Sequence, residues 1–196
     1  MTQKIVGYQS EQAALRSTQH LSAWESFHLG VNESRRNTRE GDRRAMVHLQ
    51  RAVALDPDFS SAYAILSDVA SSTAFNYYSD DRSTYLERMK AWADIAIEID
   101  PENSLACAAK GRSYWLREEP AEGLHWLDRA LQIDPNSAYA RYSRGILCGL
   151  IGDTEKTEID LGNAIQSSPL DPKIYSMRGH LALSCLQREE FEIGLE

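Results

Sequence analysis

Histidine and cysteine, the side chains best suited to metal or nucleophilic chemistry, are scattered along this chain rather than clustered. No pair of histidines has a carboxylate or cysteine partner at the spacing of a zinc site, and the cysteines form no CxxC pair. A phosphate-binding glycine loop, a nucleophile elbow and an HExxH motif are also missing from the sequence. We therefore expect no metal, no cofactor and no enzymatic activity, with reduced cysteines buried as small hydrophobic residues. A catalytic site assembled across helices is the weaker alternative. The residues concerned are His20, His28, His48, His125, His180, Cys107, Cys148 and Cys185.

The net charge of the chain argues against some classes of binding partner. The chain has 21 basic and 29 acidic residues and a formal net charge of -8, which repels phosphate backbones, so we expect no direct binding of nucleic acid. One dense arginine cluster lies within residues 35–44. We expect it to occupy a solvated loop and the start of a helix, with contact to an acidic partner or a nucleotide-bearing domain as the alternative. No apolar run approaches the roughly 20 residues of a membrane-spanning helix and the N-terminus lacks a signal core, so we expect a cytoplasmic protein with no membrane contact.

The elements that position these residues repeat along the chain. Apolar residues recur at steps of three and four, which indicates helices rather than strands. Small residues let two helix axes approach closely, a large residue fills the space beside them, and proline ends a helix. Pro120 suits a first helical position, and Asp153 can cap the helix that follows it. Several columns share one spacing: Pro101, Pro135 and Pro169; Gly111, Gly145 and Gly179; Ala96, Ala130 and Ala164; and Leu127 with Leu161.

This pattern resembles the tetratricopeptide repeat family, whose unit of about 34 residues forms one helix pair. The resemblance implies an all-α fold, a right-handed superhelical solenoid of antiparallel helix pairs. We place units at about 21–59, 60–103, 104–137, 138–171 and 172–196, and we assign residues 1–20 to an N-terminal tail or to the end of a preceding element. The second unit carries an insertion near 75–85 whose aromatic residues Phe75, Tyr77 and Tyr78 are expected to pack on the array.

The fifth unit stops early in its second helix, so we expect the chain to be a fragment of a larger protein. The stretches LSAWESFHLGV and SSPLDPKIYSMRGHLALSCLQREEFEIGLE resemble the C-terminal repeat region of bacterial multidomain regulators. In those proteins such repeats follow a class III nucleotide cyclase domain or a winged-helix DNA-binding domain. Neither domain's motifs occur in this chain, so neither activity is carried over to it.

In this family the first helices of the pairs line a concave groove, and mapping the groove positions onto the sequence predicts a binding surface. Its middle is expected to be apolar and aromatic, with Trp115, Tyr139 and Tyr142 as anchors and with Arg112, Lys173 and Asp68 as flanking charges that set register. The alternative is that these aromatic residues only close the core. Ser72, Ser176 and His180 fall at groove positions too. The residues assigned to the partner-binding groove are Leu105, Arg112, Trp115, Leu116, Tyr139, Tyr142, Ile146, Leu150, Lys173 and Met177.

The function that these observations favour is protein recognition. We expect the regulatory or sensory part of a larger bacterial signalling or transcription regulator, which binds a peptide, a helix or a flanking domain of the same protein. The clamp with which some members of the family hold chaperone tails is disfavoured, because most of its positions lack the required charge. A small-ligand sensor is one alternative. A structural spacer or a homodimer formed through the uncapped ends is the other.

Overall fold

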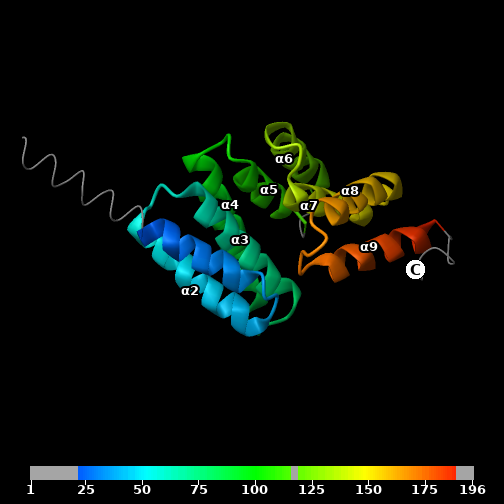
Figure 1. Cartoon of the computed structure of the whole chain (residues 1–196). Helices are drawn as coiled ribbons and strands as arrows, with labels where there is room; N and C mark the ends of the chain where they lie inside the picture. The colour runs from blue at the N-terminus through cyan, green and yellow to red at the C-terminus, as the bar shows by residue number, and fades with distance from the viewer. Residues whose placement is uncertain (1–21, 116–118, 189–196) are drawn as a thin grey trace, which may run out of the picture.

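The computed structural model describes residues 22–115 and 119–188, and within these ranges all regular secondary structure is helical. An unlabelled first helix spans residues 22–34 (Figure 1). The helices that follow are α2 (Arg39–Leu55), α3 (Ser60–Phe75), α4 (Arg82–Ile99), α5 (Ser104–Arg112), α6 (Pro120–Ile133), α7 (Ala138–Leu150), α8 (Thr154–Ser167) and α9 (Ile174–Gln187). None of the described helices is both long enough and apolar enough to cross a membrane.

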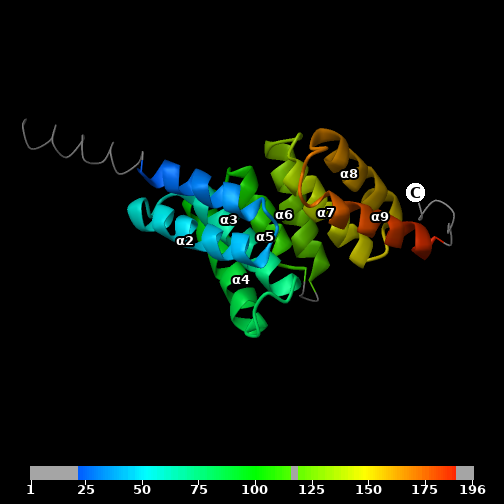
Figure 2. The same cartoon turned by 60° about the horizontal axis from the view of Figure 1, so that its bottom comes forward.

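The helices pair and stack in chain order (Figures 1 and 2). Helix α3 packs on α4, α5 on α6, and α7 on α8; each first helix also contacts the pair before it. The first helices form a continuous row in which α3 contacts α5, α5 contacts α7, and α7 contacts α9. By contrast, the second helices α4, α6 and α8 do not contact one another within the described ranges. The first helices therefore lie on the inner side of the curved stack, which confirms the all-α solenoid.

Glycine lets the two helices of a pair approach closely, as the repeat predicts. A Cβ atom added at Gly111 would lie 2.6 Å from Cγ of Leu127, and one added at Gly145 would lie 2.7 Å from Cγ of Leu161. Both leucines are fully buried. The second unit has Ser67 in place of this glycine, and its hydroxyl donates a hydrogen bond to the Met89 carbonyl at 2.8 Å. At Gly111 and Gly145 the recurring glycine and leucine thus meet the same packing requirement. No described atom lies within 4 Å of a Cβ added at Gly179, the third glycine of the column.

The alanine column forms the other half of each contact. Ala52, Ala96, Ala130 and Ala164 are all fully buried. Each carbonyl of this column accepts a hydrogen bond from the backbone N–H of the residue that ends its helix, which is aspartate in the first three cases. A proline follows each of these aspartates, and because proline cannot continue a helix the chain turns there. The predicted stop signal is therefore the observed one.

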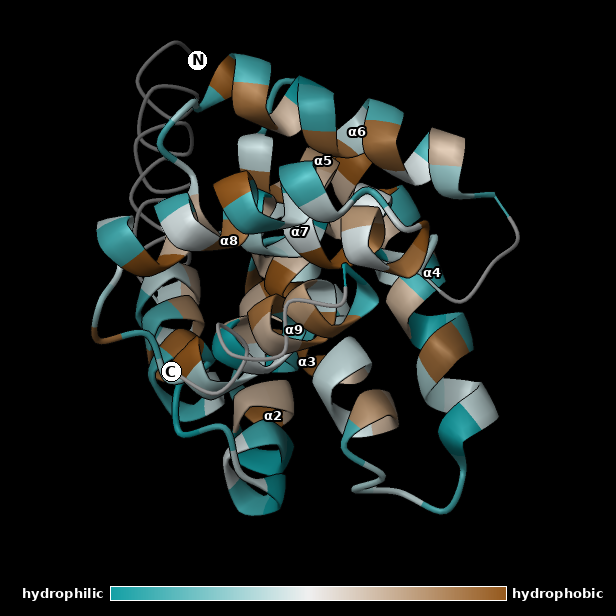
Figure 3. Ribbon diagram, turned by 90° about the vertical axis from the view of Figure 1, so that its right-hand side faces the viewer, coloured by the Kyte–Doolittle hydropathy of each residue, from teal (hydrophilic) through white to brown (hydrophobic). Residues whose placement is uncertain are grey.

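The predicted helix starts are confirmed as well. Pro120 is the first residue of α6, where its missing N–H costs no hydrogen bond. The side chain of Asp153 caps α8 by accepting from the backbone N–H of Lys156. Cys107, Cys148 and Cys185 are free of disulfide bonds and are buried as expected, and burial raises the pKa of the Cys107 and Cys148 thiols. In Figure 3 the hydrophobic stretches gather where α7 and α9 meet their neighbours.

The insertion lengthens both helices of its pair, since α3 has 16 residues and α4 has 18, against 13 and 14 for α7 and α8. Its aromatic residues do not behave alike. Phe75 contacts Trp115 edge to face, with ring centroids 5.2 Å apart, and the Tyr78 hydroxyl donates to the Asn37 carbonyl at 3.4 Å. For Tyr77 the expectation of packing is wrong, because its side chain is 74% exposed and its backbone turns through a positive φ of 54°.

Candidate functional site

The structure places the predicted groove residues on or under the inner face of the row α3, α5, α7 and α9. Trp115, Tyr142, Ile146 and Met177 are buried, and Arg112 is only 5% exposed. Leu105, Tyr139 and Lys173 are half-buried, whereas Leu150 is 62% exposed. Leu116 lies outside the described residues. The anchors chosen from the sequence are thus largely covered, and of the described groove residues only Leu150 presents most of its surface to solvent.

Three charged side chains meet at the centre of this face. The carboxylate of Asp68, on α3, accepts a hydrogen bond from Nζ of Lys173 at 2.7 Å and one from the Tyr139 hydroxyl at 3.2 Å. Nε of Arg112 lies 3.6 Å from the same carboxylate. Burial opposes ionisation of Asp68, but Lys173 and Arg112 outweigh it and hold the pKa of Asp68 below its usual value. We call Asp68, Arg112, Lys173 and Tyr139 the central cluster.

This cluster corrects the predicted groove. We expected an open apolar middle with charges at its flanks, whereas the charges occupy the middle and bridge it. Lys173 is the residue before α9 and Asp68 lies on α3, and the backbones of these two helices do not come into contact. The long lysine side chain spans the distance that curvature of the row leaves between them, because its methylene stem can cross apolar surface and deliver the charge.

Arg112 is surrounded by aromatic rings. Its guanidinium carbon lies 4.0 Å from the centroid of the Trp115 ring, 5.3 Å from that of Tyr142 and 5.8 Å from that of Tyr139. Such stacking stabilises a desolvated guanidinium. Nε of Arg112 also donates to the Ser71 hydroxyl at 3.1 Å. Burial lowers the pKa of Arg112, but the neighbouring Asp68 more than offsets this and the net shift is upward, so the arginine stays charged.

A cavity of about 260 Å³ lies beside the cluster. Two nitrogen atoms of its lining residues, Nη1 of Arg112 and Nε1 of Trp115, are buried without an acceptor among the described residues. Unpaired buried donors are uncommon in native proteins. These two donors have almost no accessible surface, so they lie behind the wall of the cavity and do not face it. Its lining residues are Asn37, Ser72, Phe75, Asn76, Arg112, Trp115, Tyr142, Ile146, Leu150, Lys173, Ser176 and His180. We call this cavity the inner pocket.

The groove positions of the repeat identified part of this lining and missed the rest. Ser72, Ser176 and His180 fall at mapped positions, and Ser176 lies 3.0 Å from the Tyr142 hydroxyl. Asn37 comes from the loop before α2, and Phe75 and Asn76 come from the end of the lengthened α3. No repeat position corresponds to these residues. In the sequence these residues were indicated only by the insertion and the longer loop. Both features show that extra residues are present, but neither predicts where those residues lie in the fold.

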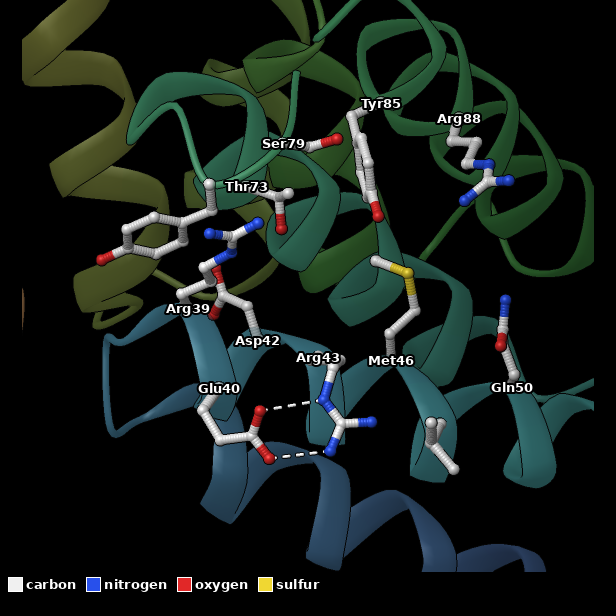
Figure 4. Close-up of a pocket in the computed structure, with 12 residues that line it drawn as sticks. Arg39, Glu40, Asp42, Arg43, Met46, Gln50, Thr73, Ser79, Tyr85 and Arg88 are labelled. Carbon is white, nitrogen blue, oxygen red and sulfur yellow. Dashed lines mark hydrogen bonds and ion pairs between the residues drawn. The ribbon is translucent and has the colours of Figure 1, made fainter. Parts of the chain in front are cut away.

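A second cavity, of about 510 Å³, lies between α2 and the lengthened pair α3 and α4 (Figure 4). It brings together the arginine cluster and the insertion, whose roles the sequence left open. Of the arginines, Arg43 pairs with Glu40 at the rim at 2.7 Å, so the cluster lies on helix α2 as well as in the loop. Figure 4 shows Asp42 reaching from α2 toward Thr73 on α3. Burial raises the pKa of Asp42 to about 6, although the Ser72 hydroxyl opposes this, and Oδ2 of Asp42 has no partner among the described residues.

Residues 22–115 and 119–188 contain no group of three or more histidine, cysteine or acidic residues arranged to hold a metal ion. Two of the buried acids, Asp68 and Asp160, pair with basic side chains. Asp160, which is almost fully buried, accepts from Nε of Arg144 at 2.6 Å and from its Nη2 at 2.8 Å. Arg144 also donates to Asp128 at 2.6 Å. These ion pairs connect α7 to α6 and α8. They give a structural role to acidic side chains that could otherwise be interpreted as metal ligands.

Comparison with known proteins supports the fold. No family model matches the chain, and no curated protein matches it. Solved structures do. A thermophilic TPR protein of Thermus thermophilus, TTC0263, superposes with a TM-score of 0.65 at 17% identity, covering 88% of this chain and 86% of that one. PilW, described as a type IV pilus biogenesis factor, gives 0.56 at 17% identity, covering 88% and 77%. MamA of Desulfovibrio magneticus RS-1 gives 0.52 at 16% identity, covering 89% of each chain. The chain therefore has the helical-repeat fold of tetratricopeptide repeat proteins.

Proposed function

We propose that this chain is a protein-recognition module of the tetratricopeptide repeat family, which receives a segment of a partner protein on its inner face. The observation that carries the proposal is the inner pocket, formed by residues of four successive first helices and open toward the exposed rim residue Leu150. Leu183, on α9, is also exposed, and α9 follows α7 in the row of first helices. A segment lying along α7 and α9 would bury both leucines and place a side chain in the pocket.

The wider setting of the module belongs to the same proposal. The helical-repeat fold and the stretches LSAWESFHLGV and SSPLDPKIYSMRGHLALSCLQREEFEIGLE support a place in the regulatory part of a cytoplasmic bacterial regulator. PilW is described as a pilus biogenesis factor, so proteins of this fold serve assembly as well. In either setting the module would act by holding a partner, with apolar burial supplying most of the affinity.

The test uses a display library of random peptides selected against the immobilised chain. We expect Leu150→Asp to lose the selected peptides, because it puts a charge at the rim of the inner pocket. The matched control is Ile159→Asp: Ile159 lies on the second helix α8 and is 54% exposed, against 62% for Leu150. Both substitutions leave the core intact, so neither should lower the melting temperature by more than a few degrees. Equal loss of binding in both variants would contradict the proposal.

A small-ligand sensor is the second candidate, and the presence of the inner pocket favours it. The pocket is somewhat smaller than the range of about 300–1,000 Å³ typical of drug-sized ligand sites. A ligand there would therefore be small.

A further inference from the structure

We propose that the second cavity, between α2 and α4, docks an acidic segment of a partner protein, with an aromatic side chain in the cavity and carboxylates on either side of it. The site goes beyond the proposed function, because most of its lining comes from the second helices α2 and α4 rather than from the first helices of the inner face. Three features support it: a local excess of positive charge, exposed cations without an ion pair, and apolar walls.

Residues 35–51 have a charge opposite to that of the whole chain. They contain six arginines and two acidic residues, whereas the chain has a formal net charge of -8. The acids are Glu40 and Asp42. Glu40 accepts hydrogen bonds from Arg43 and Arg44, which lower its pKa to about 2, so its charge is already shared by two arginines. Even with both acids fully ionised, four of the six arginines are unbalanced within this stretch.

Two exposed arginines of the cavity lining have no ion pair. Arg39 begins α2 and Arg88 lies on α4, so they approach the cavity from two different helices. Within the described ranges no acidic side chain lies within 4.0 Å of either guanidinium. Cζ of Arg88 lies 5.4 Å from the centroid of the Tyr85 ring, which also lines the cavity. The acids on either side of Arg88 in the sequence are Asp81 and Glu87; Asp81 caps α4, and neither of them lines the cavity.

The walls between these arginines are apolar and aromatic. Met46 and Val47 lie on α2, and Val47 is 57% exposed. Figure 4 shows the Tyr85 side chain reaching from α4 toward Met46, against which it packs, with Arg39 and Arg88 on opposite sides. The volume of about 510 Å³ lies within the range of about 300–1,000 Å³ that is typical of ligand sites. The cavity therefore admits an aromatic side chain, and the arginines can receive carboxylates on either side of it.

A short acidic segment fits these features better than an extended polyanion. Because residues 35–51 contribute +4 and the whole chain carries -8, the remaining residues carry -12. Nucleic acid or an anionic membrane would extend beyond the positive area and would be repelled by the rest of the surface. A phosphate group alone would gain nothing from Met46 and Val47, whereas a peptide can use both the charges and the apolar walls.

The experiment titrates the full chain with the acetylated and amidated peptide DEFDE and follows binding by ¹⁵N NMR, which detects weak complexes. Two control peptides separate the contributions. NQFNQ has nearly the same shape without the charges, and DEADE keeps the charges without the aromatic ring. We expect DEFDE to bind at least tenfold more tightly than either control, and its affinity should fall as the salt concentration rises.

Arg39→Gln combined with Arg88→Gln removes the two unpaired charges and should weaken DEFDE binding about tenfold. The matched control combines Arg51→Gln with Arg178→Gln, which changes the net charge equally at two exposed arginines outside the cavity lining. The control should weaken binding less than about twofold, because it acts only through distant charge. All four side chains are exposed, so both variants should melt within a few degrees of the unchanged chain.

Several results would overturn the inference. NQFNQ or DEADE binding as tightly as DEFDE would show that charge or the cavity has no role, and this comparison uses the unchanged chain, so it does not depend on how the variants fold. Equal weakening in the two double variants would reduce the effect to net charge. Binding to phosphatidylserine vesicles or to single-stranded DNA, without binding to DEFDE, would assign the arginines to another class of partner. The peptide selection with Leu150→Asp concerns the inner face, so the two proposals can fail separately.

Discussion

Replacing Gly111 by alanine tests the packing on which the fold rests. A methyl group at this position would lie 2.6 Å from Cγ of Leu127 and 2.8 Å from the backbone carbonyl oxygen of Gly123. Both distances are far below van der Waals contact, and the second involves backbone rather than the flexible end of a side chain. Leu127 is fully buried and has no room to retreat. Helices α5 and α6 would therefore have to move apart.

The magnitude follows from two opposing effects. Overpacking a well-filled contact usually costs about 1–3 kcal/mol, and alanine in a helix gains about 0.5–1 kcal/mol over glycine. Because backbone must move in α6, we expect the upper part of the first range, which leaves a net destabilisation of about 2 kcal/mol. Gly162 provides the control, since it lies on α8 and nothing lies within 4 Å of a Cβ built there. Gly162→Ala should therefore stabilise the chain by about 0.5–1 kcal/mol.

Urea denaturation followed by circular dichroism would measure both variants against the unchanged chain. The expected result is a lower midpoint for Gly111→Ala and a higher midpoint for Gly162→Ala, with similar slopes. If Gly111→Ala were as stable as the unchanged chain, α5 and α6 would not approach as closely as described. The interpretation of the repeating glycines as packing contacts would then be refuted.

Two further predictions concern buried acids. Asp42→Asn should leave stability unchanged below about pH 4 and raise it by at most about 3 kcal/mol at pH 7 to 8. The sign follows because the pKa of Asp42 rises from 3.8 to about 6 on folding, so the unchanged chain loses stability as pH rises through that interval. Urea denaturation of both chains at several pH values from 4 to 8 would measure this. If the free energy of unfolding changed with pH in the same way for both chains, the prediction would be contradicted. Asp160→Asn should destabilise the chain by about 2 kcal/mol, because it removes the buried negative charge that pairs with Arg144 and turns one of the two acceptor oxygens into a donor. Asp128→Asn, at a carboxylate that is 55% exposed, should cost less than about 1 kcal/mol by the same measurement.

The fold could be predicted from the sequence because the helices of each pair pack through contacts between residues that are close in sequence, and these contacts recur. Gly111 packs against Leu127, and Gly145 packs against Leu161 at the same sequence spacing. The same helix–helix contact therefore recurs along the chain. The helix ends were readable for a similar reason, because Pro120 and Asp153 act within one turn of their own position. Features of this kind depend only on residues nearby in the sequence, so they can be recognised without the tertiary structure.

The candidate site could be predicted only in part, because its contacts depend on the curvature of the whole row of first helices. The periodicity identified which positions face inward, and Tyr142, Ile146 and Lys173 do line the inner pocket. It could not show that Lys173 reaches Asp68, 105 residues earlier, since that distance is set by the accumulated rotation of several pairs. The insertion is a stronger example. Its length was evident, but the meeting of Tyr78 with Asn37 across 41 residues was not.

The central cluster also changes what the array can do mechanically. In a stacked repeat each pair contacts only its neighbours, so distant pairs are independent of one another. The bond between Asp68 and Lys173 is an exception, because it joins α3 to the start of α9 although the two helices are otherwise apart. Pairs separated by two first helices therefore share one buried carboxylate.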